Sequence, residues 1–189
     1  MLNRFLFRNT SKLPCRLIEV GGKPYLERYY LGQLLGVTFY LHRFVSSDSE
    51  RHTHNHPWKY GGAVILSGGY TEERFVDMCP ELESGYLSKL RHRRWFNRVD
   101  GRTFHRIHDA KPGTWTLFFH GRRQRVFDSK TPAWASWAKG WGFIERAEYV
   151  NPLTGRREWM SVFYNHPLTV DPEWWHTAPV GAAAGRVPL

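Results

Sequence analysis

Apolar and aromatic residues occur along this chain in short runs separated by glycine and proline, and helical spacing is weak throughout. The run from Val37 to Val45 is rich in β-branched and aromatic residues and is followed by a polar turn. Runs of the same character are Arg16–Val20, Tyr25–Leu31, Ala63–Leu66, Tyr70–Val76, Thr103–His108, Thr114–Phe119 and Arg157–Tyr164. Turn signals recur about every ten residues, which is typical of a sandwich or barrel. The pattern therefore predicts an all-β protein.

Two pairs of these runs have the character of hairpins. Ser67-Gly68-Gly69 joins Ala63–Leu66 to Tyr70–Val76, and Ala110-Lys111-Pro112-Gly113 joins Thr103–His108 to Thr114–Phe119. A tight turn between two strand-like runs favours direct antiparallel pairing.

The remaining organisation is simple. Pro132–Lys139 is the best helical candidate, from its Ala and Trp spacing. Residues 1–180 fit one domain, and Gly181 to Leu189, composed largely of small residues, is expected to be a flexible C-terminal tail.

Three of the ten histidines lie between Arg51 and Trp58. Residues two apart in a strand point to the same side, so His54 and His56 would aim two imidazoles at one point. Neutral imidazole is a ligand for Zn, Cu, Fe and Ni. Pro57 would end regular strand pairing there. The alternatives are a solvated histidine cluster or one structural histidine packed against Trp58.

Later segments offer further ligands. By alternation one of Glu72 and Glu73 faces inward, and we favour Glu72 as a carboxylate ligand, although both could be solvated edge charges. His105 precedes a predicted strand pair and could project inward, whereas His108 falls on the opposite face.

Two residues are candidates for binding the substrate, and a further histidine, His42, is assigned a structural role. Arg106 could hold an anion at the barrel mouth by a bidentate contact. Tyr70 shares a face with Glu72 and is the second candidate. His42 is interpreted as a satisfied core histidine.

Several motifs, in order, resemble a group of small bacterial and phage cupin proteins. They are Tyr25-Leu-Glu-Arg-Tyr-Tyr-Leu, Tyr40-Leu-His-Arg-Phe, His54-Asn-His-Pro-Trp, Gly68-Gly-Tyr-Thr-Glu, Phe104-His-Arg-Ile and Gly113-Thr-Trp-Thr-Leu-Phe-Phe, within roughly Arg16 to Arg123. The resemblance implies a double-stranded β-helix (cupin, jelly-roll) barrel with minor helical segments. Its first motif supplies a His-x-His pair and a Glu, and its second supplies one more His.

Carried over residue by residue, His54 and His56 match the pair and His105 matches the later His. Where the motif places its Glu, this chain has Tyr60-Gly61-Gly62, so Glu72 would be a substitute. The expected cofactor is a divalent metal ion, with Fe, Zn, Ni and Mn all left open.

The composition adds expectations about partners and compartment. Lys and Arg number 27 against 17 Asp and Glu, a formal charge of +10, which attracts anions. The basic runs Lys89–Arg98 and Gly121–Arg125 contain the residues for nucleic-acid contact, but we favour solvated loops. No apolar run is long enough to cross a bilayer, the start is too interrupted by Arg4 and Arg8 for a signal peptide, and only two cysteines occur. We expect a cytoplasmic protein without membrane contact.

Three functional hypotheses are consistent with these residues and with the resemblance. The first is a metal-dependent enzyme that acts on a small anionic substrate, with non-haem Fe(II) dioxygenase-like or isomerase chemistry. The second is a non-catalytic cupin that binds a sugar or nucleotide. The third is a phage or prophage accessory protein that contacts nucleic acid or a host protein. A homodimer stays open.

Overall fold

The structure is a computed structural model. It describes residues 1–47, 53–56, 58–79, 82, 86–100, 103–122, 142–150, 152–165 and 173–189. Helix α1 (Leu2–Asn9) and the short 3-10 helix η1 (Thr10–Lys12) come first. The strands are β1 (Cys15–Val20), β2 (Lys23–Leu34), β3 (Val37–Phe44), β4 (Gly61–Ser67), β5 (Tyr70–Met78), β6 (Tyr86–Arg93), β7 (Phe96–Val99), β8 (His105–Ala110), β9 (Thr114–His120), β10 (Gly142–Val150) and β11 (Arg157–Asn165). The 3-10 helices η4 (Trp174–His176) and η5 (Gly181–Ala183) follow.

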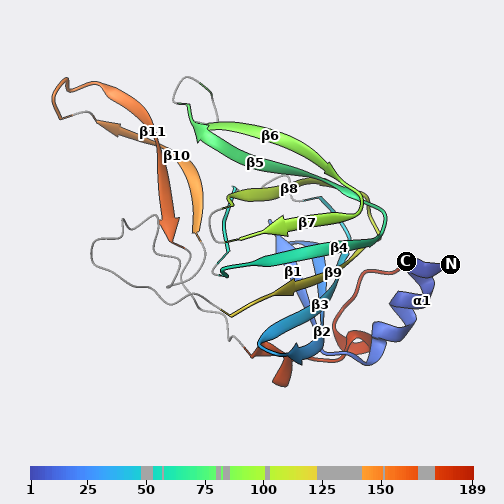
Figure 1. Ribbon diagram of the computed structural model, residues 1–189. Coiled ribbons are helices and arrows are strands. Elements are labelled where there is room, and N and C mark those ends of the chain that lie inside the picture. Colours follow the sequence, from blue (N-terminus) through green and yellow to red (C-terminus); the bar gives the residue numbers. More distant parts are fainter. Residues whose placement is uncertain are drawn as a thin grey trace.

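Two antiparallel sheets form the body of the molecule (Figure 1). The larger has the order β1-β2-β3-β9-β4-β7, and the smaller has the order β6-β5-β8. An isolated antiparallel bridge between His54 and His105 adds the segment around His54 to the free side of β8. The order His54 segment-β8-β5-β6 therefore faces the order β3-β9-β4-β7, with the chain passing repeatedly from one sheet to the other. This is the strand order of a jelly roll. The predicted fold, an all-β double-stranded β-helix with minor helices, is confirmed.

Both hairpin predictions are wrong, although all four strands exist. β4 pairs with β7 and β9, whereas β5 pairs with β6 and β8. The turn at Gly68 and Gly69, whose φ angles are 80° and 159°, therefore carries the chain between sheets. The turn between β8 and β9 does the same, because those strands also belong to different sheets. Crossing between sheets lets the apolar faces of successive strands face each other across the core.

The main core lies between the sheets. Its buried members are Tyr25, Leu26, Phe44, Ile65, Tyr70, Ile107 and Ala110, contributed by both sheets. A second cluster lies where α1 covers the outer face of the larger sheet. There Trp115 stacks on Tyr29 and packs with Leu6 and Phe7, and its Nε1 donates to Asn3 Oδ1 at 2.7 Å. Helix α1 was not predicted from the sequence.

The C-terminal residues contact a buried ion pair. Arg43 Nη1 lies 2.9 Å from Glu27 Oε1, and the guanidinium also donates to the carbonyl oxygens of Val187 and Pro188 at 2.6 and 3.1 Å. The Val187 amide donates to Glu27 Oε1 at 2.8 Å. We call this arrangement the C-terminal clasp. Composition led us to expect residues 181–189 to form a flexible tail. Within this segment, the clasp supplies partners for two buried charges.

Other predictions have mixed outcomes. The late strand is present as β11, paired with β10 in a separate hairpin. The basic run Lys89–Arg98, for which we favoured a solvated loop, forms most of β6 and β7. The helical candidate Pro132–Lys139 lies outside the described residues. Cys15 and Cys79 both carry reduced thiols, and no helix in the described part of the chain is long and apolar enough to span a membrane.

Candidate metal centre

The strand pairing between His54 and His105 builds the site. The two residues exchange backbone hydrogen bonds, with His54 N to His105 O at 2.9 Å and His105 N to His54 O at 2.8 Å. Residues opposed in this way present their side chains on the same face of the sheet. His56 lies two residues beyond His54 and therefore returns to that face. Sequence-distant histidines thus converge because of one bridge.

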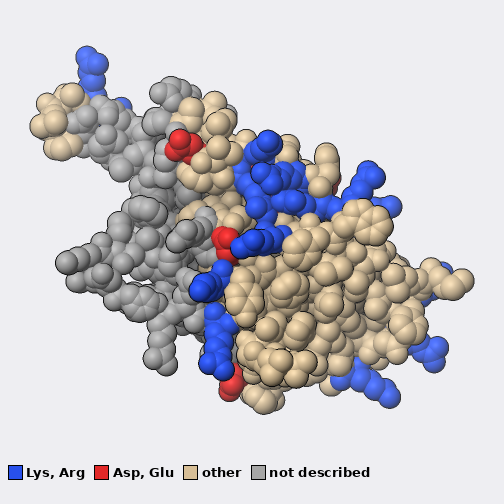
Figure 2. Space-filling model, in the orientation of Figure 1, with Lys and Arg blue, Asp and Glu red and all other residues tan. Residues whose placement is uncertain are grey.

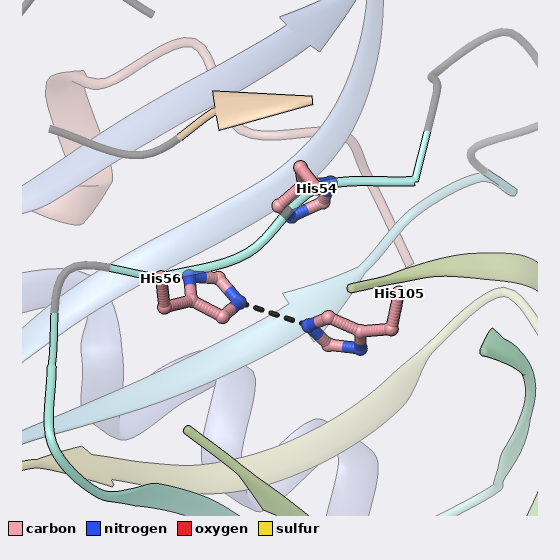
Figure 3. Close-up of side chains that lie close together, drawn as sticks. All are labelled: His54, His56 and His105. Carbon is pink, nitrogen blue, oxygen red and sulfur yellow. Dashed lines mark hydrogen bonds between the residues drawn. The ribbon is translucent and has the colours of Figure 1, made fainter. Parts of the chain in front are cut away.

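The three imidazoles form a nearly equilateral triangle (Figure 3). Ring centroids are 5.2 Å apart for His54 and His56, 5.4 Å for His54 and His105, and 5.1 Å for His56 and His105. One ligand nitrogen of each residue lies within 4.8 Å of the other two. His54 and His105 are buried, and His56 is partly buried.

These residues fit a metal ion. Metal–nitrogen bonds of about 2.0–2.1 Å place two nitrogens on one ion about 3.0–3.4 Å apart. The Nε2 atoms of His56 and His105 are 2.9 Å apart, close to this range and joined by a hydrogen bond. Neutral, buried imidazoles are the donor set that Zn, Fe and Ni accept. The wider 4.8 Å span of the group means that the rings would draw together on a cation.

Glu72 lies behind His105 rather than within the triangle. Its Oε1 is 2.7 Å from His105 Nδ1. Because an ionised carboxylate only accepts, Nδ1 carries the proton, and Nε2 of the neutral ring has a lone pair that accepts the hydrogen bond from His56 Nε2. This is the hydrogen bond by which carboxylates commonly orient metal-binding histidines. The structure thus places the predicted ligand Glu72 in contact with a candidate ligand, and outside the group of candidate ligand atoms.

Glu72 is fully buried and completely hydrogen-bonded. Its Oε2 accepts from Arg74 Nε at 2.8 Å and from Arg93 Nε at 2.9 Å, and its Oε1 also accepts from Asn97 Nδ2 at 2.9 Å. Burial alone would raise the pKa of Glu72, but hydrogen bonds from His105, Arg74 and Asn97 hold it well below its usual value. The carboxylate is therefore charged at neutral pH and locked in position.

His56 is held by aromatic stacking. Its ring stacks on Trp58, with ring centroids 4.7 Å apart and an interplanar angle of 13°. Trp58 also stacks on His120, with ring centroids 4.1 Å apart. Burial lowers the pKa of His56 well below its ordinary value, and protonation of the neighbouring His105 or His54 would lower it further. A neutral His56 is the form that a metal requires.

A pocket of about 100 Å³ opens in front of the triangle. Tyr70, predicted to bind substrate, lies on its wall, buried and packed against Phe44 at 5.5 Å between ring centroids. His42 also lies on the wall and accepts a 3.0 Å hydrogen bond from Arg28 Nε. Burial lowers the pKa of His42 well below its usual value. His42 is thus a satisfied histidine, as interpreted, and also faces the pocket.

The arginine that lines the pocket is Arg28, and not the predicted Arg106. Arg106, predicted to bind substrate, pairs with Glu73 and does not line the pocket. Arg106 and Glu73 alternate with His105 and Glu72 along β8 and β5, so they lie on the other face of the smaller sheet. Sequence reasoning missed Arg28, which lines the pocket. The available signal was its position opposite His42 in neighbouring strands, which is visible only once the pairing is known.

Comparisons with known proteins are limited. No family model and no curated protein sequence matches the chain. Hydroxypropylphosphonic acid epoxidase from S. wedmorenis superposes with a TM-score of 0.41 at 12% identity, over 60% of this chain and 56% of its own. A cupin-2 domain protein, Rru_A2000 from Rhodospirillum rubrum, gives 0.35 at 15% identity over 62% and 76%, respectively. AerE from Microcystis aeruginosa gives 0.36 at 11% identity over 81% and 65%. The match thus spans little more than half of the epoxidase chain, and the jelly-roll assignment rests on the strand order.

Proposed function

We propose that this protein is a metal-binding cupin, of the small bacterial and phage type that its motifs resemble, and that it holds a divalent cation with His54, His56 and His105. The observation that carries the proposal is the triangle of imidazoles, together with the hydrogen bond that directs His105 Nε2 toward the other rings. Three neutral nitrogen ligands favour Fe, Zn or Ni, and Mn is the fourth candidate.

The catalytic form of the proposal is a metal-dependent enzyme that acts on a small anionic substrate. A bound cation with three protein ligands supplies Lewis acidity, or redox chemistry of the non-haem iron type, at its open positions. Glu72 holds the proton on His105 Nδ1, and the stacked Trp58 fixes the plane of His56. Apolar side chains on the pocket wall restrict water near the site. The non-catalytic form uses the same pocket for ligand binding alone.

The decisive measurement is the metal content of purified variants. His54→Ala removes one ligand nitrogen and should lose most of the bound metal. His108→Ala is the matched control, because His108 is an exposed histidine on the same strand as His105 and outside the triangle. Elemental analysis should show full metal in the control. Equal metal in wild type and His54→Ala would refute the proposal.

Metal dependence also separates the two forms. In the catalytic form, dioxygen consumption or substrate turnover stops when the metal is chelated and returns when it is restored. In the binding form, ligand affinity survives chelation and no turnover occurs.

A second candidate function, nucleic-acid binding, is favoured by the β6–β7 turn. Trp95 is 83% exposed there and follows the exposed Arg94. Lys89 and Arg91 are exposed on the neighbouring edge strand β6, and Figure 2 shows Lys and Arg side chains gathered over β5 and β6. Exposed aromatic and Arg side chains can stack on bases and neutralise phosphates.

Binding of a fluorescent single-stranded oligonucleotide tests this candidate. Affinity should fall steeply with salt and drop in Trp95→Ala. Arg94→Gln should weaken binding, whereas Arg8→Gln, which removes the same charge from exposed helix α1, should not. Similar losses in both arginine variants would indicate attraction by net charge alone and would count against a site at the turn.

A further inference from the structure

The pocket in front of the three histidines has a polar row on its wall that metal binding does not use. Arg28 on β2 pairs with His42 on β3, and His42 pairs with Thr116 on β9. Cross-strand partners share a face, so the three side chains form one row across the larger sheet. All three line the pocket. The row lies between sheet positions that are mainly apolar and aromatic.

Arg28 makes this wall positive. Its Nε donates to His42 Nε2, which fixes the plane of the guanidinium and shows that His42 accepts as a neutral ring. Among the described residues that line the pocket, Arg28 is the one with a formal charge at neutral pH, and none is Asp or Glu. A guanidinium matches the geometry of a carboxylate better than an ammonium does. A wall with one positive charge is best matched by a small anion that carries one negative charge.

Thr116 marks a second polar contact in the pocket. The residue is 1% exposed, and its Oγ1 is buried without a hydrogen-bond partner. A buried hydroxyl without a partner destabilises the fold, and most such groups in proteins are satisfied. Rotation about the Cα–Cβ bond of Thr116 would turn this hydroxyl toward a ligand in the pocket, which would supply the missing partner.

The volume and the remaining wall limit the size of the ligand. The pocket holds about 100 Å³, less than the cavity of about 150 Å³ that accommodates benzene. Leu26, Phe44, Val99 and Ile107 make much of the lining apolar. A sugar or a nucleotide is too large and too polar for this space. An aliphatic chain of a few carbons fits it.

We propose that this pocket binds a short-chain aliphatic carboxylate, with its carboxylate group on Arg28 and a hydrogen bond from Thr116. The inference deepens the proposed function, because the ligand would lie beside the proposed metal-binding histidines and would form the substrate class of that site. It concerns residues on the opposite wall, so it can be tested without metal.

Calorimetric titration of chelator-treated protein measures the binding directly. Sodium propionate is the main probe, and neutral propionamide is its uncharged match. Octanoate tests the size limit, and inorganic phosphate tests selectivity among anions. We expect propionate to bind more tightly than the other three. Equal binding of propionate and propionamide, or tighter binding of octanoate or phosphate, would overturn the proposal.

Two pairs of variants locate the site. Arg28→Gln should weaken propionate binding at least about tenfold, because a charge-assisted hydrogen bond is lost, whereas Arg8→Gln on exposed α1 should bind normally. Thr116→Val should weaken binding about three- to tenfold while leaving stability unchanged or higher, since its hydroxyl has no protein partner.

Thr114→Val is the converse control. Thr114 lies on the same strand but outside the pocket, and its Oγ1 donates to Gly69 O at 3.0 Å. This variant should lose stability and keep propionate binding. Normal binding in both Arg28→Gln and Thr116→Val would refute the inference.

The two proposals fail separately. Loss of metal binding with intact propionate binding refutes the metal site alone. If the wild type binds metal, His54→Ala loses the metal and the wild type does not bind propionate, the carboxylate site alone is refuted.

Discussion

Replacing Glu72 with Gln tests how the candidate metal centre is supported. The carboxylate is fully buried and accepts hydrogen bonds from His105, Arg74, Arg93 and Asn97. An amide has one acceptor oxygen, and its NH₂ group would face donors. Glu72→Gln therefore leaves at least one buried donor without an acceptor and removes the counter-charge of two arginines.

The cost of this change can be estimated from exposure. The Arg74 and Arg93 side chains are 19% and 18% exposed, so solvent partly screens them once Glu72 is neutral. Breaking a buried ion pair costs about 3–5 kcal/mol, and this screening favours the lower end, about 3 kcal/mol. Loss of the hydrogen bond that orients a metal-binding histidine weakens metal affinity about 10–100-fold.

Glu73→Gln is the matched control for Glu72→Gln. Glu73 is the next residue on β5, on the other face, and it forms an ion pair with Arg106, whose side chain is 20% exposed. Glu73 is also buried, so the same chemical change should lower stability there too, but Glu73 lies on the other face of the sheet from the histidines and metal affinity should stay unchanged.

Urea denaturation of metal-free protein gives the free energies of unfolding, and competition with a chromophoric chelator gives the metal affinities. If both variants had the same stability and metal affinity, the reasoning about Glu72 would be refuted. If Glu72→Gln lost metal as completely as His54→Ala, Glu72 would be a direct ligand, as the sequence led us to expect.

Three further predictions concern the scaffold. Burial raises the pKa of the Cys15 thiol from 9.0 to about 12, so between these pH values the folded state keeps a proton that the unfolded state loses. The free energy of unfolding should therefore fall as pH rises through this window. Urea denaturation of Cys15→Ala should show a less steep fall of the free energy of unfolding over the same pH range. Deleting residues 186–189 removes the C-terminal clasp and should lower the free energy of unfolding by about 2–4 kcal/mol. Deleting Leu189 alone should change the free energy of unfolding little. Equal values for the two deletions would show that the clasp does not stabilise the fold. Gly68→Ala should lower the melting temperature more than Gly22→Ala does. Both glycines have a positive φ, but a Cβ at Gly68 would clash with Thr114, whereas a Cβ at Gly22 would meet open space. Equal shifts of the melting temperature would refute this steric argument.

Local pattern was sufficient to predict much of the strand content. Val37–Val45 is β3 almost residue for residue, because β-branched and aromatic side chains suit a pleated strand whatever its partner. Alternation also indicated that His54 and His56 share a side and that His105 and His108 do not. These statements need only the two-residue period of an extended chain, which is a property of the backbone.

Local pattern could not predict helix α1 or the C-terminal clasp, because both depend on contacts between residues far apart in the sequence. Helix α1 is stabilised by packing on Trp115, and the last residues are held by Arg43 and Glu27, more than 140 positions away. Composition describes these segments in isolation, whereas their contacts are with distant elements.

The tertiary structure alone decided which strands pair, and with that it decided the site. Adjacent runs such as β4 and β5 belong to opposite sheets, because burying both apolar faces outweighs the short loop that would favour a hairpin. The bridge between His54 and His105, the position of Glu72 behind His105, and the row from Arg28 to Thr116 all follow from pairings between distant segments. Sequence sets which side chains share a face of one strand. Only the folded chain determines which faces meet, because that choice minimises exposed apolar surface over the whole molecule.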